Sequence, residues 1–324
     1  MKKIDAHIHF PGDHPDCLSM LERLNIKHLN ICVVHDEADN WRSQADGYGG
    51  LASDQPDRFA WCTSIDLPRF DDAEYVERAI AGLEQDFAAG AIACKIWKNI
   101  GMAVKKPNGE FMMIDDPLFD PIYEHLTKLE RPLLLHIGEP LACWQPLDED
   151  NPHYGYYSRN PQWHMYNQPQ YPSHQTLIEA RDHMVAKHPR LKVIGAHLAS
   201  LEYDVAEVAK RLDRYPNFAV DTSARMPDLA YQQSDLVRRF FQDYPDRILF
   251  GTDMVFRQPF STLTEGERQT ALASAEERYQ THFDYFESDQ IVTVRERQVQ
   301  GLGLSEEILE QFYRRNAQRW YPGL

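Results

Sequence analysis

Short apolar segments rich in β-branched residues alternate with longer amphipathic segments from one end of the chain to the other. Such an alternation is typical of buried parallel strands that are separated by helices. Helical periodicity follows most of the apolar segments, for example over residues 72–88, 117–130 and 203–214. The pattern predicts eight strands, at residues 3–9, 29–35, 59–65, 91–97, 132–137, 192–197, 218–222 and 247–251.

Eight βα units within 324 residues match the size of a closed α/β barrel, the (β/α)8 TIM barrel. An open, doubly wound sheet usually carries a glycine-rich turn after its first strand, but here that position holds His7-Ile8-His9-Phe10-Pro11-Gly12. No low-complexity linker divides the sequence, so we expect residues 1–324 to form a single domain. Two segments exceed what a barrel needs: a long aromatic loop after the fifth strand, at 138–172, and an extra C-terminal helical segment, at 262–287.

Acidic residues outnumber basic ones by 50 to 34, which gives a formal charge of −16. A chain this acidic is not expected to bind the phosphate backbone of a nucleic acid. No apolar run is long enough to cross a bilayer and the chain begins without a signal-peptide core, so we expect a cytoplasmic protein that binds no membrane. The five cysteines form no C-x-x-C pair and are expected to be small core residues in a reducing compartment.

Two histidines, His7 and His9, are separated by one residue on the first predicted strand, so their imidazoles point to the same face. Taken alone, this pair fits a metal site or a polar core equally well. Three further candidates also follow apolar runs, because His136, His197 and Asp253 stand at the ends of the fifth, sixth and eighth predicted strands. Catalytic groups of a TIM barrel project from the carboxyl ends of its strands, so these residues together predict a metal site there.

The order of these motifs resembles the amidohydrolase superfamily. Within it, the chain is similar to the amidohydrolase-related branch that includes aminocarboxymuconate-semialdehyde decarboxylase and related decarboxylases, hydratases and hydrolases. The resemblance spans nearly the whole chain but does not specify one reaction, since the branch changes its chemistry on a common frame. It is carried by Ile4-Asp5-Ala6-His7-Ile8-His9, Cys94-Lys95-Ile96, Leu135-His136, Gly195-Ala196-His197, Phe250-Gly251-Thr252-Asp253 and Arg315-Asn316-Ala317.

The resemblance implies that His7, His9, His136 and Asp253 surround one divalent cation, zinc or manganese, with an open position for water or substrate. Water bound to such an ion has a pKa near neutrality and becomes a usable nucleophile. Asp253 would then serve as a metal ligand, as the base for that water, or as both.

The resemblance also places His197 where this branch has a catalytic histidine, which would transfer protons near neutral pH. The alternative is a site with two metals, in which His197 is a ligand and Lys95 is a carboxylated bridge at the end of the fourth strand. In a site with one metal, Lys95 would instead support a substrate oxygen or form a structural salt bridge.

Candidate substrate-binding residues lie after the fifth and seventh strands. Arg225 could hold a substrate carboxylate through two hydrogen bonds, unless it forms an ordinary surface ion pair. Arg257 is a weaker candidate of the same kind, and Glu139 is a candidate for orienting a metal ligand. The loop at 138–172, with Trp144 among its aromatic residues, would either roof a pocket or bury a subunit contact. We therefore expect a small-molecule substrate and a homo-oligomer.

Three functions follow from these residues. The first is a metal-dependent hydrolase that acts on a small-molecule amide, ester or lactone through a metal-activated water. The alternative is a metal-dependent lyase, a non-oxidative decarboxylase or hydratase of an unsaturated or aromatic carboxylic acid, in which Arg225 holds the carboxylate and His197 delivers a proton to carbon. The third is a binding protein that holds metal without turnover. Hydrolysis is slightly favoured, because the loop rich in Trp and Tyr after His136 differs from the loop expected of the decarboxylases.

Overall fold

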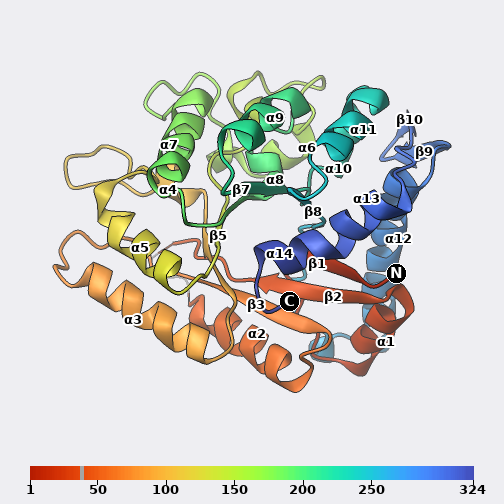
Figure 1. The fold of residues 1–324 in the computed structure, drawn as a ribbon, viewed down its shortest axis with the longest axis horizontal. Coiled ribbons are helices and arrows are strands. Elements are labelled where there is room, and N and C mark those ends of the chain that lie inside the picture. The colour runs from red at the N-terminus through yellow and green to blue at the C-terminus, as the bar shows by residue number, and fades with distance from the viewer. Residues whose placement is uncertain (37–39) are drawn as a thin grey trace.

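Eight parallel strands form the centre of the computed structural model, which describes residues 1–36 and 40–324 (Figure 1). Each strand pairs with the next one in sequence, and helices surround the sheet, so the fold is the predicted (β/α)8 barrel. The strands are β1 (Lys3–Ile8), β2 (Ile26–Ile31), β3 (Phe59–Ser64), β4 (Ala93–Ile96), β5 (Leu133–Leu135), β6 (Val193–Gly195), β7 (Phe218–Asp221) and β8 (Ile248–Leu249).

Backbone hydrogen bonds between β1 and the segment after β8 join the two edges of the sheet. The amide of Ala6 donates to the carbonyl of Phe250 at 2.9 Å, and the amide of Asp253 donates to the carbonyl of His7 at 2.8 Å. One step further along, the amide of His9 donates to the carbonyl of Met254 at 2.9 Å. The barrel is therefore nearly closed, and its first strand lies beside its last.

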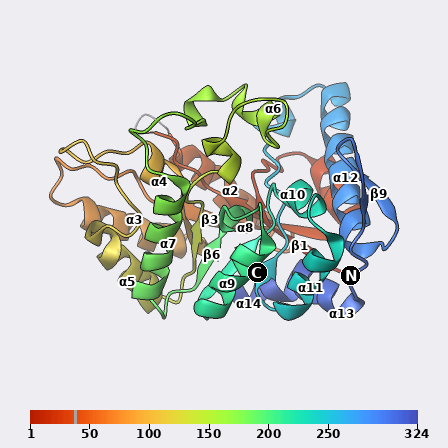
Figure 2. The same cartoon turned by 90° about the horizontal axis from the view of Figure 1, so that it is seen from above.

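The helices cover the outside of the barrel (Figure 2). Three of the longer ones begin at side-chain caps, because Ser173, Asp204 and Thr264 each accept a hydrogen bond from a backbone amide in the first turn. The helices are α1 (Pro15–Leu24), α2 (Arg42–Asp54), α3 (Tyr75–Ala88), α4 (Asn99–Met102), α5 (Asp120–Lys128), α6 (Tyr154–Tyr157), α7 (His174–Lys187), α8 (Ala196–Ala199), α9 (Val205–Arg214), α10 (Met226–Ala230), α11 (Ser234–Asp243), α12 (Glu265–Glu287), α13 (Glu306–Glu310) and α14 (Asn316–Trp320).

The extra helical segment predicted near the C-terminus is α12, the longest helix among the described residues at 23 residues. It begins with a capping box in which Thr264 and Glu267 bond each other's backbone amides. A short hairpin of β9 (Ile291–Val294) and β10 (Arg297–Gln300), which the sequence pattern did not predict, follows it. No helix in the described part of the chain is both long enough and apolar enough to span a membrane.

Two strand boundaries differ from the prediction in ways that matter for the site. The second strand starts at Ile26 rather than at residue 29 and ends at Ile31 rather than at residue 35, because Ile26 pairs with Lys3 of β1. The sixth strand ends at Gly195, so His197 lies beyond it in irregular backbone. The loop at 138–172 contains only the short helix α6 and single turns of 3-10 helix.

Candidate metal centre and pocket

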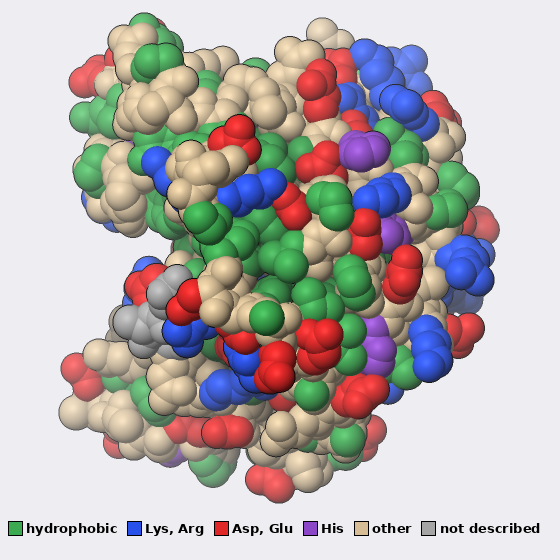
Figure 3. Space-filling view, turned by 90° about the vertical axis from the view of Figure 1, so that its left-hand side faces the viewer, with side chains coloured by type: hydrophobic (Ala, Val, Ile, Leu, Met, Phe, Trp, Pro, Cys, Tyr) green, Lys and Arg blue, Asp and Glu red, His purple; other side chains and the backbone are tan. Residues whose placement is uncertain are grey.

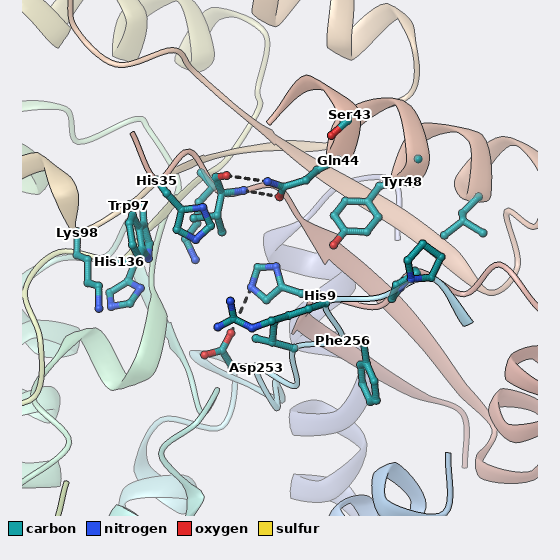
Figure 4. A pocket seen from close by; sticks show the side chains of 18 of the residues that line it. His9, His35, Ser43, Gln44, Tyr48, Trp97, Lys98, His136, Asp253 and Phe256 are labelled. Atoms are coloured by element: carbon teal, nitrogen blue, oxygen red, sulfur yellow. Dashed lines mark hydrogen bonds and ion pairs between the residues drawn. The ribbon is translucent and has the colours of Figure 1, made fainter. Parts of the chain in front are cut away.

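His7 of β1 and His9, which follows this strand, face the carboxylate of Asp253 across the seam of the barrel. The nitrogen or oxygen ligand atoms of His7, His9 and Asp253 all lie within 4.8 Å of one another. His9 Nε2 is 3.3 Å from Asp253 Oδ1 (Figure 4), and His7 Nε2 is 3.6 Å from the same oxygen. Two imidazoles and one carboxylate form a donor set that fits zinc or another divalent transition metal. The structure thus brings three of the four predicted metal ligands together.

A buried carboxylate that the sequence analysis did not single out, Asp221 at the end of β7, stands behind His7. His7 Nδ1 donates to Asp221 Oδ2 at 2.8 Å, which leaves His7 Nε2 as the lone-pair nitrogen that faces Asp253. Burial alone would raise the pKa of Asp221, but the adjacent His7 and further hydrogen bonds lower it to about 2. The sequence could have pointed to Asp221, because it is a carboxylate that ends the apolar strand Phe218–Asp221.

His197 is held in a strained backbone that directs its imidazole into the site. Residues 197–200 all have φ between 54° and 59°, a left-handed conformation that disfavours L-residues with a side chain. The amide of His197 donates to Asp221 Oδ1 at 2.8 Å, and Arg181 donates to the carbonyl of Ala199, which hold this turn in place. His197 Nδ1 is 2.8 Å from the carbonyl of Ser223, so Nε2 is its proton-accepting nitrogen. Burial lowers the pKa of His197 to about 3, so the imidazole is neutral at pH 7.

His136, the fourth predicted ligand, lies beside His197 rather than within the group of three. Its Nδ1 is 3.2 Å from His197 Nε2, and its Nε2 has no hydrogen-bond partner among the described residues. Burial, and then the electrostatic interaction with the neighbouring His197, keep the pKa of His136 well below its usual value. A buried nitrogen without a partner is what an additional metal or substrate contact requires, so a bound cation fits the residues present.

Lys95 extends from β4 into the same site, as both of its predicted roles require. Its Nζ is 3.0 Å from His7 Nε2, and the residue is 1% exposed. Burial lowers the pKa of Lys95, an effect that the nearby Asp253 and Asp221 oppose. The side chain therefore faces the candidate metal ligands, and among the described residues it forms no ion pair that would give it the alternative structural role.

The site opens into a pocket of about 1280 Å³. α2 contributes Gln44 and Tyr48 to one side, and Trp97 and Lys98 lie on another side (Figure 4). Trp163 from the aromatic loop also lines the pocket. The prediction that this loop roofs a pocket is thus supported for Trp163, whereas α2 had not been predicted as a wall.

On the side of the molecule where α3 and α5 lie, acidic and basic side chains are interspersed (Figure 3).

Lys98, which lines the pocket together with His136, forms a buried ion pair with Glu139. Both side chains are 3% exposed, and Lys98 Nζ lies 4.3 Å from the ring centre of Trp163 and 5.1 Å from that of Trp97. Burial lowers the pKa of Lys98 to about 7. Glu139 therefore pairs with a lysine that the sequence analysis missed. The structure shows no direct contact between Glu139 and the metal ligands.

Arg225, the predicted carboxylate clamp, is buried next to the histidines rather than paired at the surface. The residue is 8% exposed, its Nη1 donates to the carbonyl of Ala224 at 3.1 Å, and its Nε has no partner among the described residues. Its positive charge contributes to the lowered pKa values of His136 and His197. Arg257 lines the pocket and is exposed, whereas Arg225 is not among the residues that line it.

The structure does not support the predicted contact between Trp144 and a substrate. Trp144 is absent from the residues that line the pocket, and its indole Nε1 donates to the carbonyl of Pro172 at 3.1 Å. Its ring packs against His174 with 5.3 Å between the ring centres. The indole is therefore used to fold the aromatic loop onto α7, while Trp163 and Tyr156 of the same loop reach the pocket.

The sequence matches the family model described as Amidohydrolase over residues 4–323. The chain therefore belongs to the amidohydrolase family, which confirms the resemblance drawn from the strand-end motifs. No curated protein matches the sequence significantly.

Solved structures share this fold at low sequence identity. The 2,6-dihydroxybenzoate decarboxylase from Rhizobium is 17% identical with a TM-score of 0.57, and the match covers 99% of this chain and 98% of that chain. The 4-oxalomesaconate hydratase from Rhodopseudomonas palustris is 13% identical with a TM-score of 0.53, covering 99% and 96%. A dihydroxybenzoic acid decarboxylase from Polaromonas sp., with bound manganese and the inhibitor 2-nitroresorcinol, is 15% identical with a TM-score of 0.51, covering 87% and 97%.

We predict that Asp221→Asn lowers the affinity of the protein for zinc by about 10- to 100-fold, because carboxylates that orient metal-binding histidines contribute about this much. The measurement is a zinc titration in competition with a chromogenic chelator. The matched control is Asp228→Asn, since Asp228 also pairs with a histidine, His153, at 2.9 Å but outside the metal centre. An unchanged zinc affinity in Asp221→Asn would contradict the role assigned to this carboxylate.

A second prediction concerns the buried carboxyl group of Glu202, whose Oε1 accepts a hydrogen bond from the amide of Leu141 at 3.0 Å. Burial raises the pKa of Glu202 to about 7, although the nearby Arg225 opposes the shift. The folded state therefore holds this proton more tightly than the unfolded state, so the group destabilises the fold increasingly as the pH rises from about 4.5 to about 7.

Glu202→Gln should consequently gain stability relative to the wild type as the pH rises from 5 to 8, by at most about 3 kcal/mol. Urea unfolding at several pH values measures this difference. Glu277→Gln, at an exposed position of α12, is the control and should show no such trend. A constant difference between Glu202→Gln and the wild type across this pH range would show that Glu202 has the same pKa in both states.

Proposed function

We propose that this protein is a metal-dependent lyase that removes CO2, without oxidation, from a small aromatic or unsaturated carboxylic acid. The observation that carries the proposal is the buried Arg225, whose Nε has no partner among the described residues and whose positive charge lowers the pKa values of His136 and His197. A buried cation without a paired carboxylate is costly unless an anionic group binds to it. A substrate carboxylate supplies such a group.

Relatives support the same reaction class. Among the structures that share this fold, two act on dihydroxybenzoates as decarboxylases and one is a hydratase. They favour the lyase, which the sequence analysis gave as its alternative, over hydrolysis. The planar rings of Trp97 and Trp163 in the pocket wall also fit a flat, conjugated substrate.

In this proposal, His7, His9 and Asp253 hold the cation, with His136 as the further ligand expected from the sequence. A divalent cation held there would stabilise negative charge that develops on the oxygen atoms of the substrate. Zinc fits the ligands, and manganese is the ion in the related structure from Polaromonas sp..

The residues of the chain handle the carboxylate and the proton. Arg225 binds and orients the substrate carboxylate. When the bond to this group breaks, CO2 leaves and the bonding electron pair remains on the substrate carbon. His197 is neutral at pH 7, so its Nε2 first accepts a proton from a substrate hydroxyl or from solvent and then returns it to that carbon. The net reaction consumes one proton and releases one CO2.

Hydrolysis of an amide, ester or lactone is the second candidate. The observation in its favour is the orientation of His197. Its Nδ1 faces the carbonyl of Ser223, which leaves Nε2 as a general base for water. The buried Arg225 does not serve this reaction unless the ester or amide also carries an acidic group.

The first test of the proposal follows CO2 release and the loss of absorbance from a panel of dihydroxybenzoates, including 2,6-dihydroxybenzoate, alongside a panel of lactones and amides. We expect turnover of an acid that a chelator lowers by at least about 100-fold and that added zinc or manganese restores. Turnover of lactones or amides but of no acid would contradict decarboxylation and favour hydrolysis. Turnover that the chelator does not affect would contradict a metal-dependent mechanism.

We further predict that Arg225→Gln lowers kcat/KM for the active acid by about 10- to 100-fold, because it removes charged hydrogen bonds to the carboxylate. Most of the change should appear in KM if the guanidinium binds the ground state and the transition state equally. Arg239→Gln, at an exposed position of α11, serves as the matched control. If Arg225→Gln keeps the melting temperature and the kinetic constants of the wild type, Arg225 does not bind the substrate carboxylate.

A further inference from the structure

The helix α12, which a minimal barrel does not need, places one buried hydroxyl group against the first strand. Tyr279 lies in the middle of α12 and is completely buried. Its hydroxyl donates to Asp5 Oδ2 at 2.7 Å and lies 3.0 Å from His28 Nε2 on β2. Figure 1 shows α12 beside α1 at the edge of the barrel where β1 begins. This contact therefore links an added outer helix to the strand that carries His7 and leads into His9.

Asp5 is the point where this link meets the seam of the barrel. Its Oδ2 also accepts a hydrogen bond from Thr252 Oγ1 at 2.6 Å. Its Oδ1 accepts from the amide of Thr252 at 3.1 Å and from the amide of His7 at 3.2 Å. One buried carboxylate thus holds the backbone of His7 and the residue next to Asp253, which are on opposite sides of the seam.

The hydrogen bonds of Tyr279 have one consistent direction. An ionised carboxylate only accepts hydrogen bonds, and Asp5 accepts from Thr252 on both of its oxygens. The hydroxyl of Tyr279 is therefore a further donor to this carboxylate. The oxygen of that hydroxyl is then free to accept from His28 Nε2–H, which agrees with the other ring nitrogen, Nδ1, having no partner among the described residues. Such a chain of buried hydrogen bonds fixes the position of Asp5 more strongly than a single contact.

The backbone at Asp253 needs this support. Its φ of 54° is in the left-handed region, which is strained for a residue with a side chain. The adjacent Thr252 is bonded to Asp5 through both its amide and its hydroxyl, and the amide of Met254 lies 3.3 Å from the same hydroxyl. The strained turn that points Asp253 toward the metal site is therefore held from the side of Asp5.

We propose that Tyr279 is a positioning residue of the metal centre, which acts through Asp5 to set the spacing between His7 and Asp253. The inference rests on the metal-binding part of the proposed function. It gives α12 a role beyond covering the barrel, because this helix contributes to metal affinity without contacting the metal ligands.

Tyr279→Phe tests the proposal because it removes only the hydroxyl. The ring, which packs against Phe250 and Phe283, remains. The matched control is Tyr285→Phe on the same helix, since Tyr285 is also completely buried but its hydroxyl has no hydrogen-bond partner among the described residues. Any general effect of losing a buried hydroxyl from α12 appears in both variants.

The readouts are the zinc affinity, measured by competition with a chromogenic chelator, and the visible absorption spectrum of the cobalt-substituted protein. We expect Tyr279→Phe to bind zinc about 10-fold more weakly and to shift the cobalt bands, with Tyr285→Phe close to wild type in both. Equal affinity and identical spectra for Tyr279→Phe and wild type would overturn the proposal. A wild type that binds neither zinc nor cobalt would instead overturn the metal centre itself.

A second variant keeps the proposal testable if Tyr279→Phe does not fold. His28→Phe keeps a ring of similar shape but removes the donor that orients the hydroxyl of Tyr279. We expect a smaller loss of zinc affinity in the same direction, about 3-fold, since the bond from Tyr279 to Asp5 remains. A zinc affinity equal to that of the wild type in a folded His28→Phe would contradict the proposed chain of hydrogen bonds.

Discussion

The pairing of β1 with the segment after β8 is the constraint on which the metal centre depends. His7 and His9 come from the start of the chain and Asp253 from the segment after its last barrel strand, so these candidate ligands meet only when the barrel closes. The amide of Asp253 bonds the carbonyl of His7 directly, which makes closure and ligand assembly the same event. A cation that binds the closed barrel therefore stabilises the seam as well as the site, since a ligand specific for the folded state adds its binding free energy to folding.

Charges inside this barrel are tolerated because almost every one has a partner. Asp221 accepts from His7 and from two backbone amides, Asp5 accepts four hydrogen bonds, and Lys98 is paired with Glu139. An unpaired buried polar group costs free energy, so the exceptions are informative. Among the described residues, the buried nitrogen atoms without partners include His136 Nε2 and Arg225 Nε. These are the positions where a ligand of the protein would complete the hydrogen bonding.

The pocket combines walls from segments that are far apart in the sequence. Tyr48 of α2 faces the metal ligands from one side, whereas Trp97 and Lys98 follow β4 and Trp163 belongs to the loop after β5. Aromatic composition drew attention to that loop, but it could not distinguish Trp163, which reaches the pocket, from Trp144, which bonds the carbonyl of Pro172. The path of the loop decides this difference, and the path depends on contacts such as that between Leu141 and the buried Glu202.

The sequence alone determined the alternation of strands and helices, the barrel class and the residues that end its strands, because hydrophobic period and strand-end position are local properties of the chain. His7, His9, His197 and Asp253 could be named as site residues for this reason. Only the tertiary structure decided that Asp221 orients His7, that Lys98 pairs with Glu139, that His136 adjoins His197, and that Tyr279 reaches Asp5. Each of these relations joins segments distant in sequence through a left-handed turn, a loop path or an added helix, and no local pattern encodes which side chains such features bring face to face.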